Sequence, residues 1–354
     1  MADQREQNEP VTATEQPAAA PQPSTTELPP IEADTASIDE SSSIGGFSID
    51  DSQASITSSL LDYRRENGRT YHRLSEGKYY FPNDEQEQDR LDIVNHLWMV
   101  LLDGAFCKCP KNDGAKRVLD LGTGTGIWSL DYADAHPDAE VIGVDLSAIQ
   151  PGYVPPNCSF ELDDLEKEWT WTRPFDFIFC RNMIGSFTDW DKLIKKAYDN
   201  LEPGGYFEIQ DSQWPAVSDD GSLKEDSALY KWMHTLTDCA KNNGQPIHLT
   251  ETFDSIMEAV GFEEVQKVPI RFPVSPWPKD KKLRELGLWT QASLLPGIEG
   301  MTLAAFTRLL GWTREETLVH CAQVRKDIKD LSIHAYYKGY IIHGRKPLKA
   351  DKEE

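Results

Sequence analysis

Short runs of consecutive apolar residues recur along the chain from about residue 60, separated by glycine, proline and acidic residues. Such runs are typical of strands buried on both faces of a sheet. Five of them predict strands at residues 116–121, 140–144, 158–162, 175–180 and 206–210. Two more predict a sixth and a seventh strand, at 262–272 and 334–344.

Apolar residues at spacings of three or four positions separate these strands and predict helices. The clearest case is residues 89–106, where Leu91, Val94 and Leu97 share one face. Further helices are predicted at 126–136, 190–201, 223–243, 250–261, 280–293, 301–310 and 313–330. Strands that alternate with helices indicate an α/β fold with a doubly wound, seven-stranded, mostly parallel sheet. We expect the helices at about 273–330 to form a cap over the sheet.

Residues 1–45 differ in composition from the rest of the chain. They contain six prolines, no aromatic residue, and nine acidic residues against one base, Arg5. Such a segment cannot bury enough apolar surface to offset the entropy lost on folding, so we expect a disordered acidic tail. The remaining predicted parts are an N-terminal segment with its helix (46–106), a sheet domain with its cap (107–347) and a charged tail (348–354).

The whole chain has 36 Lys and Arg against 59 Asp and Glu, a net charge of −23. This balance disfavours direct binding to nucleic acid or to anionic membranes, which attract basic proteins. No apolar run approaches the roughly 20 residues of a membrane-spanning helix, and no secretory signal is expected. Six scattered cysteines indicate reduced structural thiols, and no residue cluster has metal-ligand spacing. We therefore expect no metal and a cytoplasmic or nuclear location.

The strongest chemical signal is the sequence VLDLGTGTGIWSL at residues 118–130. A buried strand ends at Asp120, and glycines follow at alternate positions, 122, 124 and 126, before a helix. Glycine permits a sharp turn and a close approach of ligand to backbone, and the helix presents its N-terminal amides to a polar ligand. Asp145, at the end of the second strand, stands where a carboxylate accepts hydrogen bonds from ribose hydroxyls.

Two cofactor classes fit this outline. The dinucleotide pattern G-x-G-x-x-G needs a third glycine where this chain has Ile127. The observed spacing, acid-x-G-x-G-x-G, places Asp120 where it would repel a pyrophosphate and attract an ammonium or a sulfonium. This favours S-adenosylmethionine, and a nicotinamide-dependent oxidoreductase is the disfavoured alternative.

The glycine-rich segment resembles the first motif of class I S-adenosylmethionine-dependent methyltransferases, which have a Rossmann-like fold. The segment from Tyr63 to Trp98 is similar to a narrower fungal family, the methyltransferases related to the LaeA regulator of secondary metabolism. The runs FELDDLEKEWTW and FDFIFCRNMIGSFTDW are similar to that family too. The resemblance covers about residues 60–347.

The resemblance implies a set of residues around the cofactor. Asp120 would face the methionine ammonium, and Asp145 would bind the ribose hydroxyls. Asp163 and Asp164 are equally good candidates for holding the adenine amino group. The full implied set is Asp120, Gly122, Thr123, Gly124, Gly126, Asp145, Leu146, Asp163, Asp164, Leu165 and Arg181.

The catalytic side is less clearly marked. Methyl transfer requires alignment of nucleophile, methyl and sulfur, and a general base where the acceptor carries a proton. His72 and its neighbour Tyr71 are candidates because the segment around them can fold over the cofactor. His248 and His234 are candidates because they follow the fifth strand.

Other polar and aromatic residues are weaker candidates for contact with the substrate. Glu208 and Asp211 flank the end of the fifth strand, and we favour a structural role for them over contact with substrate. Five tryptophans would either line a pocket for an aromatic or polyketide-like acceptor or form the core of the cap: Trp214, Trp232, Trp277, Trp289 and Trp312.

Two functions fit these observations. The first is methyl transfer from S-adenosylmethionine to a small-molecule acceptor, in fungal secondary metabolism. The alternative is a regulator of secondary-metabolite gene expression that acts with a protein partner in the nucleus. The sequence shows no obvious basic nuclear-import cluster, which favours the first.

Overall fold

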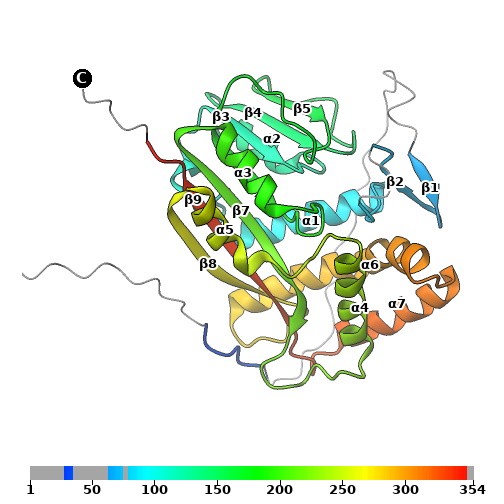
Figure 1. Cartoon of the computed structure of the whole chain (residues 1–354). Coiled ribbons are helices and arrows are strands. Elements are labelled where there is room, and N and C mark those ends of the chain that lie inside the picture. The colour runs from blue at the N-terminus through cyan, green and yellow to red at the C-terminus, as the bar shows by residue number, and fades with distance from the viewer. Residues whose placement is uncertain (1–27, 35–62, 75–78, 349–354) are drawn as a thin grey trace, which may run out of the picture. The chain divides into compact units, whose positions relative to one another are not determined.

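A computed structural model describes residues 28–34, 63–74 and 79–348 (Figure 1). Its centre is a seven-stranded sheet with the strand order β5-β4-β3-β6-β7-β9-β8. The strands are β3 (Arg117–Leu121), β4 (Glu140–Asp145), β5 (Cys158–Leu162), β6 (Phe175–Arg181), β7 (Leu201–Val217), β8 (Glu263–Pro273) and β9 (Tyr336–Arg345). Only β9 runs antiparallel to its neighbours in this sheet, so the prediction of a mostly parallel, doubly wound sheet is confirmed.

Alternating side chains of the central strands enter two separate cores, one on each face of the sheet. In β3, Val118 packs with α2 (Ile127–Ala135) on one face, while Leu119 packs with α3 (Trp190–Asn200) and α5 (Phe253–Val260) on the other. Both kinds of position are apolar because both faces are covered, which explains the continuous apolar runs in the sequence.

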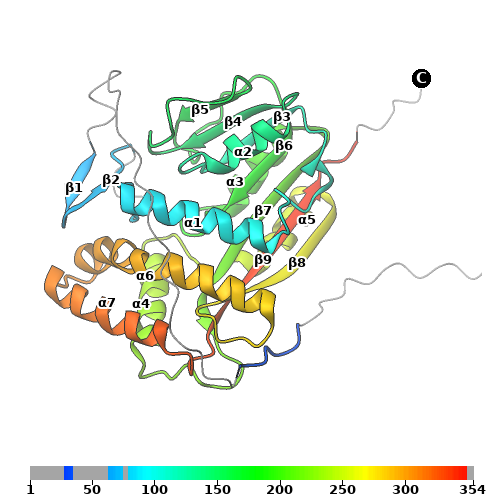
Figure 2. The same cartoon turned by 180° about the vertical axis from the view of Figure 1, so that it is seen from behind.

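A third core joins the remaining long helices into the cap. They are α1 (Glu85–Leu101), α4 (Ala228–Asn242), α6 (Lys281–Leu309) and α7 (Arg314–Lys329). Helix α1 lies between α2 and α6, which both views show (Figures 1 and 2). The cap therefore includes α4, which precedes β8, in addition to the predicted helices at 273–330; the domain boundaries themselves stay a prediction.

The predicted pair of helices at 280–293 and 301–310 is one continuous helix, α6, and the prediction of a break was wrong. Pro296 removes one backbone donor from the helix interior, where a helix is normally broken or kinked. Two carbonyls at this point accept side-chain donors from other helices: Gln86 Nε2 donates to Pro296 O (3.0 Å) and Arg325 Nε donates to Leu295 O (2.9 Å).

Shorter elements complete the chain. An antiparallel hairpin of β1 (Arg64–Glu66) and β2 (Arg69–Tyr71) was not among the predicted elements. Two short 3₁₀ helices, η1 (Pro110–Asn112) and η2 (Thr250–Thr252), precede β3 and α5. Within the described ranges, no helix has the length and apolar character needed to cross a membrane.

Most of the predicted disordered tail (1–45) lies outside the described residues, but part of it is ordered. Ala33 forms a β-bridge with Pro278, and the backbone N–H of Lys279 donates to Glu32 O over 2.8 Å. Asp34 forms an ion pair with Arg284 of α6. Disorder is therefore the wrong description for residues 31–34, which gain backbone partners from the segment before α6.

Candidate active site

A cavity opens at the carboxyl ends of β3, β4, β5 and β6, where parallel α/β sheets commonly bind ligands. Residues from the glycine-rich turn, from the ends of β4 and β5 and from α1 line it. All the residues that the resemblance implied around the cofactor, except Gly126, are in this lining. Gly126 is instead the residue that directly precedes α2.

The glycines of the turn have a steric reason to be glycine. Gly122 and Gly126 have positive φ angles of +71° and +81°. A Cβ atom at Gly122 would lie 2.0 Å from Met183 Sδ, and one at Gly126 would lie 2.4 Å from the ring of Phe160. Backbone conformation thus disfavours a side chain at both positions, and at Gly126 the Phe160 ring also occupies the space, as the motif predicted.

Two buried carboxylates flank the turn. Asp120 accepts hydrogen bonds from the hydroxyls of Thr123 and Ser129, each at 2.7 Å. Asp145 accepts the backbone N–H groups of Gly124 and Ser147, each at 2.9 Å. Burial raises the pKa of Asp120 and raises the pKa of Asp145 to about 6, although these hydrogen bonds act in the opposite direction.

Arg181, at the end of β6, supplies a donor that the protein leaves unused. Its Nη2 donates to Asn95 Oδ1 of α1 over 2.5 Å, while its Nη1 is buried without a hydrogen-bond partner. Burial lowers the pKa of this guanidinium to about 10, and Asp120 acts against that shift. A buried donor without a partner costs free energy, so this end of the cavity suits a ligand with an anionic group such as a carboxylate.

The structure distinguishes the neighbouring acids Asp163 and Asp164. Both line the cavity, but Asp163 is exposed and Asp164 is only 4% exposed. Asp164 Oδ1 accepts the backbone N–H of Glu166 (3.1 Å), which fixes the turn after β5. Leu165 lies beside it, 6% exposed, and gives this end of the cavity an apolar surface next to a carboxylate.

A second cavity adjoins the first and reaches into the cap. Four residues line both cavities: Tyr79, Phe81, Leu91 and Asn182. Asn182 follows β6, and its Oδ1 accepts the indole N–H of Trp98 (3.1 Å), which lines the second cavity. The two cavities therefore meet along a shared wall at the ends of β6 and α1.

Sequence similarity to known proteins shows the family to which this chain belongs. A family model described as a methyltransferase domain matches residues 73–267, more than half of the chain. The chain belongs to the methyltransferase family. Its cofactor is S-adenosylmethionine, and the orphaned Arg181 donor and the side-chain-free glycine turn fit that group.

Three fungal relatives illustrate the match. Methyltransferase pytC of Aspergillus terreus is 40% identical over 299 residues, which is 84% of this chain and 92% of that protein. Secondary metabolism regulator LAE1 of Cochliobolus heterostrophus is 36% identical, over 80% of this chain and 94% of that one. Protein-methionine methyltransferase laeA of Emericella nidulans is 35% identical, over 81% and 77%. These relatives confirm the fungal family that the sequence resembles.

The histidine and tyrosine candidates for the methyltransferase's base lie elsewhere. Among the described residues that line the two cavities, His72, Tyr71 and His248 do not appear. Both ring nitrogens of His72 are within hydrogen-bond distance of backbone carbonyls, those of Leu74 (2.6 Å) and Tyr79 (3.2 Å). Tyr71 is 1% exposed beneath the guanidinium of Arg308.

His234 and the tryptophans have mainly structural surroundings. The ring of His234 stacks on Tyr230 and its Nδ1 is 2.9 Å from the Tyr230 carbonyl. Of the five tryptophans considered for a pocket, only Trp214 lines the second cavity. Trp232 packs in the cap core and donates to Thr302. Trp98 also lines the second cavity. It was not predicted there, because in the sequence it is one of the regularly spaced apolar residues of α1 and nothing marks it as a ligand-binding residue.

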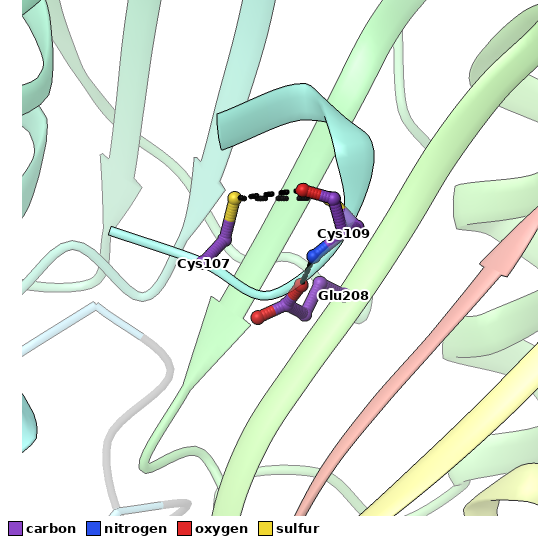
Figure 3. Close-up of side chains that lie close together, drawn as sticks. All are labelled: Cys107, Cys109 and Glu208. Atoms are coloured by element: carbon purple, nitrogen blue, oxygen red, sulfur yellow. Dashed lines mark hydrogen bonds between the residues drawn. The ribbon is translucent and has the colours of Figure 1, made fainter. Parts of the chain in front are cut away.

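Glu208 and Asp211, two carboxylates of β7, have different roles. Glu208 accepts the backbone N–H groups of Lys108 (2.9 Å) and Cys109 (2.6 Å), of which Figure 3 shows the second. These hydrogen bonds hold the turn before β3 against the sheet. Ligand atoms of Glu208, Cys107 and Cys109 lie within 4.8 Å of one another. These donors occupy the carboxylate, so its geometry favours a structural role over metal binding. Asp211 instead lines the second cavity, which the sequence analysis did not favour.

Proposed function

We propose that the first cavity holds S-adenosylmethionine in one orientation. The methionine carboxylate would accept from Arg181 Nη1, and its ammonium would lie near Asp120. The ribose hydroxyls would donate to Asp145, and the adenine amino group to Asp164. The buried position of Asp164 supports it over Asp163, because a hydrogen bond shielded from water discriminates more strongly.

We propose that the second cavity holds a small, largely apolar acceptor molecule. The observation that carries this proposal is the wall that the cavities share, with Asn182 and Leu91 facing both. An acceptor in the second cavity would meet the cofactor only there. When bound, the cofactor supplies an electrophilic methyl group, and the protein's main contribution is to hold an acceptor in line with it and away from water.

Protein methylation is the second candidate, and one observation favours it. The thioether of Met183 lies in the lining of the cofactor cavity, beside Gly122. One fungal relative is named a protein-methionine methyltransferase. This alternative would require a nucleophile from protein, and it leaves the apolar second cavity without a role.

The test is to incubate the purified protein with methyl-labelled S-adenosylmethionine and an extract of its own source organism. The products are then separated into small-molecule and protein fractions. The matched blank is Gly124→Asp, which places a carboxylate beside Asp145 at a position with φ +58°. We expect label in the small-molecule fraction only. Label in the protein fraction alone would contradict the proposed acceptor, and loss of that label in Met183→Leu would establish the alternative.

A further inference from the structure

The second cavity is apolar over most of its wall and polar at several points. Trp98, Phe272, Leu294 and Met301 provide apolar surface from three different elements, α1, β8 and α6. Two of the polar points are the carboxylate of Asp211 and the hydroxyl of Tyr337. Buried polar groups in an apolar pocket select the orientation of a ligand, so these two groups bear on which acceptor fits.

Asp211 is 1% exposed and lies at the carboxyl-terminal part of β7. Its two oxygens accept backbone N–H groups, from Ile184 (2.7 Å) and from Ser212 (2.8 Å). Ile184 belongs to the loop after β6 whose residue Asn182 faces both cavities. Asp211 is therefore hydrogen-bonded directly to the segment that separates the acceptor from the cofactor.

In the part of the chain that the structure describes, no positively charged side chain that lines this cavity is available to pair with the Asp211 carboxylate. Among the described residues that line it, Arg90 is the only lysine, arginine or histidine, and Arg90 is already bonded to Glu87. The other groups there that can ionise are Cys239 and the tyrosines 79, 80 and 337. Burial raises the pKa of Asp211 to about 7, although the N–H groups of Ile184, Ser212 and Met183 act in the opposite direction. A carboxylate of that basicity can take a proton at neutral pH.

Tyr337, on β9, gives the second polar point. Its side chain is 4% exposed, and its hydroxyl is buried without a hydrogen-bond partner. Burial raises the pKa of this phenol, so it remains a neutral donor. A buried hydroxyl without a partner is costly in the free protein and is satisfied by a ligand oxygen.

We infer that Asp211 is the general base for methylation of a hydroxyl group, and that the acceptor is a largely apolar hydroxylated molecule with a second oxygen bound by Tyr337. In the reaction the acceptor O–H proton passes to the Asp211 carboxylate as the oxygen–methyl bond forms. The sulfur–methyl bond breaks, and the cofactor leaves as a neutral thioether, so atoms and charge balance. This inference rests on the proposed small-molecule function.

The experiment compares wild type, Asp211→Asn and Tyr337→Phe on the unmethylated acceptor, identified through its labelled product from the extract. Asparagine keeps an oxygen for the Ile184 N–H but cannot take the proton. We expect Asp211→Asn to bind S-adenosylmethionine within about twofold of wild type by calorimetry and to lose about 10²–10⁴-fold in kcat. This deficit should shrink as the pH rises toward the acceptor's own pKa, which a merely structural role for Asp211 would not produce.

Three further readouts can overturn the inference separately from the proposed function. The label should be released from the purified product by reagents that cleave O-methyl ethers; a stable C-methyl or N-methyl product contradicts it. Tyr337→Phe should weaken equilibrium binding of the purified acceptor, measured without cofactor, by about tenfold; unchanged binding removes Tyr337 from the inference. A kcat of Asp211→Asn equal to that of wild type at neutral pH would show that Asp211 is not the general base. Failure of the proposed function looks different, because wild type itself would then label no small molecule.

Discussion

Glu87 and Arg90 lie one turn apart on α1 and form an ion pair in which Arg90 Nη2 is 2.6 Å from Glu87 Oε1. Glu87 lines the cofactor cavity, and Arg90 lines the acceptor cavity. Their side chains are 2% and 11% exposed. The two side chains of this helix therefore neutralise each other. Neither charge is left to attract a ligand of opposite charge into its cavity.

We predict that Arg90→Met destabilises the protein strongly. It would leave the Glu87 carboxylate buried without its partner, at a cost of about 3–5 kcal/mol in the free energy of unfolding. The double variant Glu87→Gln with Arg90→Met should recover much of that loss, because no buried charge remains. The measurement is urea unfolding at pH 7.

Lys195→Met is the matched control for that prediction. Lys195 and Asp199 form an exposed ion pair on α3, whose side chains are 53% and 55% exposed. Its loss should change the free energy of unfolding by no more than about 0.5 kcal/mol. If Arg90→Met were as mild as this control, the buried pair would have no special role in stability.

We predict that Asp164→Ala and Asp163→Ala differ in cofactor affinity. Loss of a buried hydrogen bond to a charged group costs about 1.5–3 kcal/mol, which is roughly a ten- to hundredfold rise in the Kd of S-adenosylmethionine. Asp163 is exposed, and its loss should change Kd by about twofold at most. Titration calorimetry measures both. The reverse order of effects would place the adenine on the other acid.

The strands and the cofactor turn were predictable because local sequence determines them. A strand buried on both faces must be apolar at consecutive positions, as in β3 and β6, and the turn before α2 requires glycine at positive φ. The β1–β2 hairpin also had a local signal, Asn67-Gly68 with φ of +52° and +81°, a typical hairpin turn that the sequence reading did not use.

The continuity of α6 and the acceptor cavity depend on contacts between distant segments. The carbonyls of Leu295 and Pro296 accept donors from α7 and α1, which no local pattern could indicate. Asp211 and Tyr337 come from strands that are adjacent in space but separated by the cap helices in sequence. Their importance as a pair appears only when β9 is placed beside β7.

We predict that Asp211 makes the stability of the protein depend on pH. Its pKa is about 7 in the folded protein and near its usual value of 3.8 when unfolded. Between about pH 4 and pH 7 the folded state therefore binds more protons, so the contribution of Asp211 to stability falls as the pH rises through that window. Asp211→Asn should gain stability relative to wild type at pH 8 and little at pH 4.

Chemical denaturation across this range measures the effect. One pKa unit corresponds to about 1.4 kcal/mol, so the gain at pH 8 is at most about 4 kcal/mol. Asp120 and Asp145 contribute in the same direction in both proteins and cancel in the difference. Glu225→Gln, at an exposed position, is the control and should show no such trend. A constant difference between wild type and Asp211→Asn would show that the folded-state pKa is not raised.

We predict that Glu208→Gln destabilises the fold without a metal being involved. Its carboxylate accepts from Lys108, Cys109 and the side-chain amide of Gln210 (2.8 Å), and a glutamine nitrogen in place of one oxygen would face these donors. We expect a loss of about 2–4 kcal/mol in the free energy of unfolding, with cofactor affinity in the folded protein unchanged, since Glu208 does not line the cofactor cavity. The competing explanation is an ion held by Glu208, Cys107 and Cys109. It predicts that a chelator lowers the melting temperature of wild type but not of Cys107→Ser, whereas a purely hydrogen-bonded carboxylate leaves both unaffected.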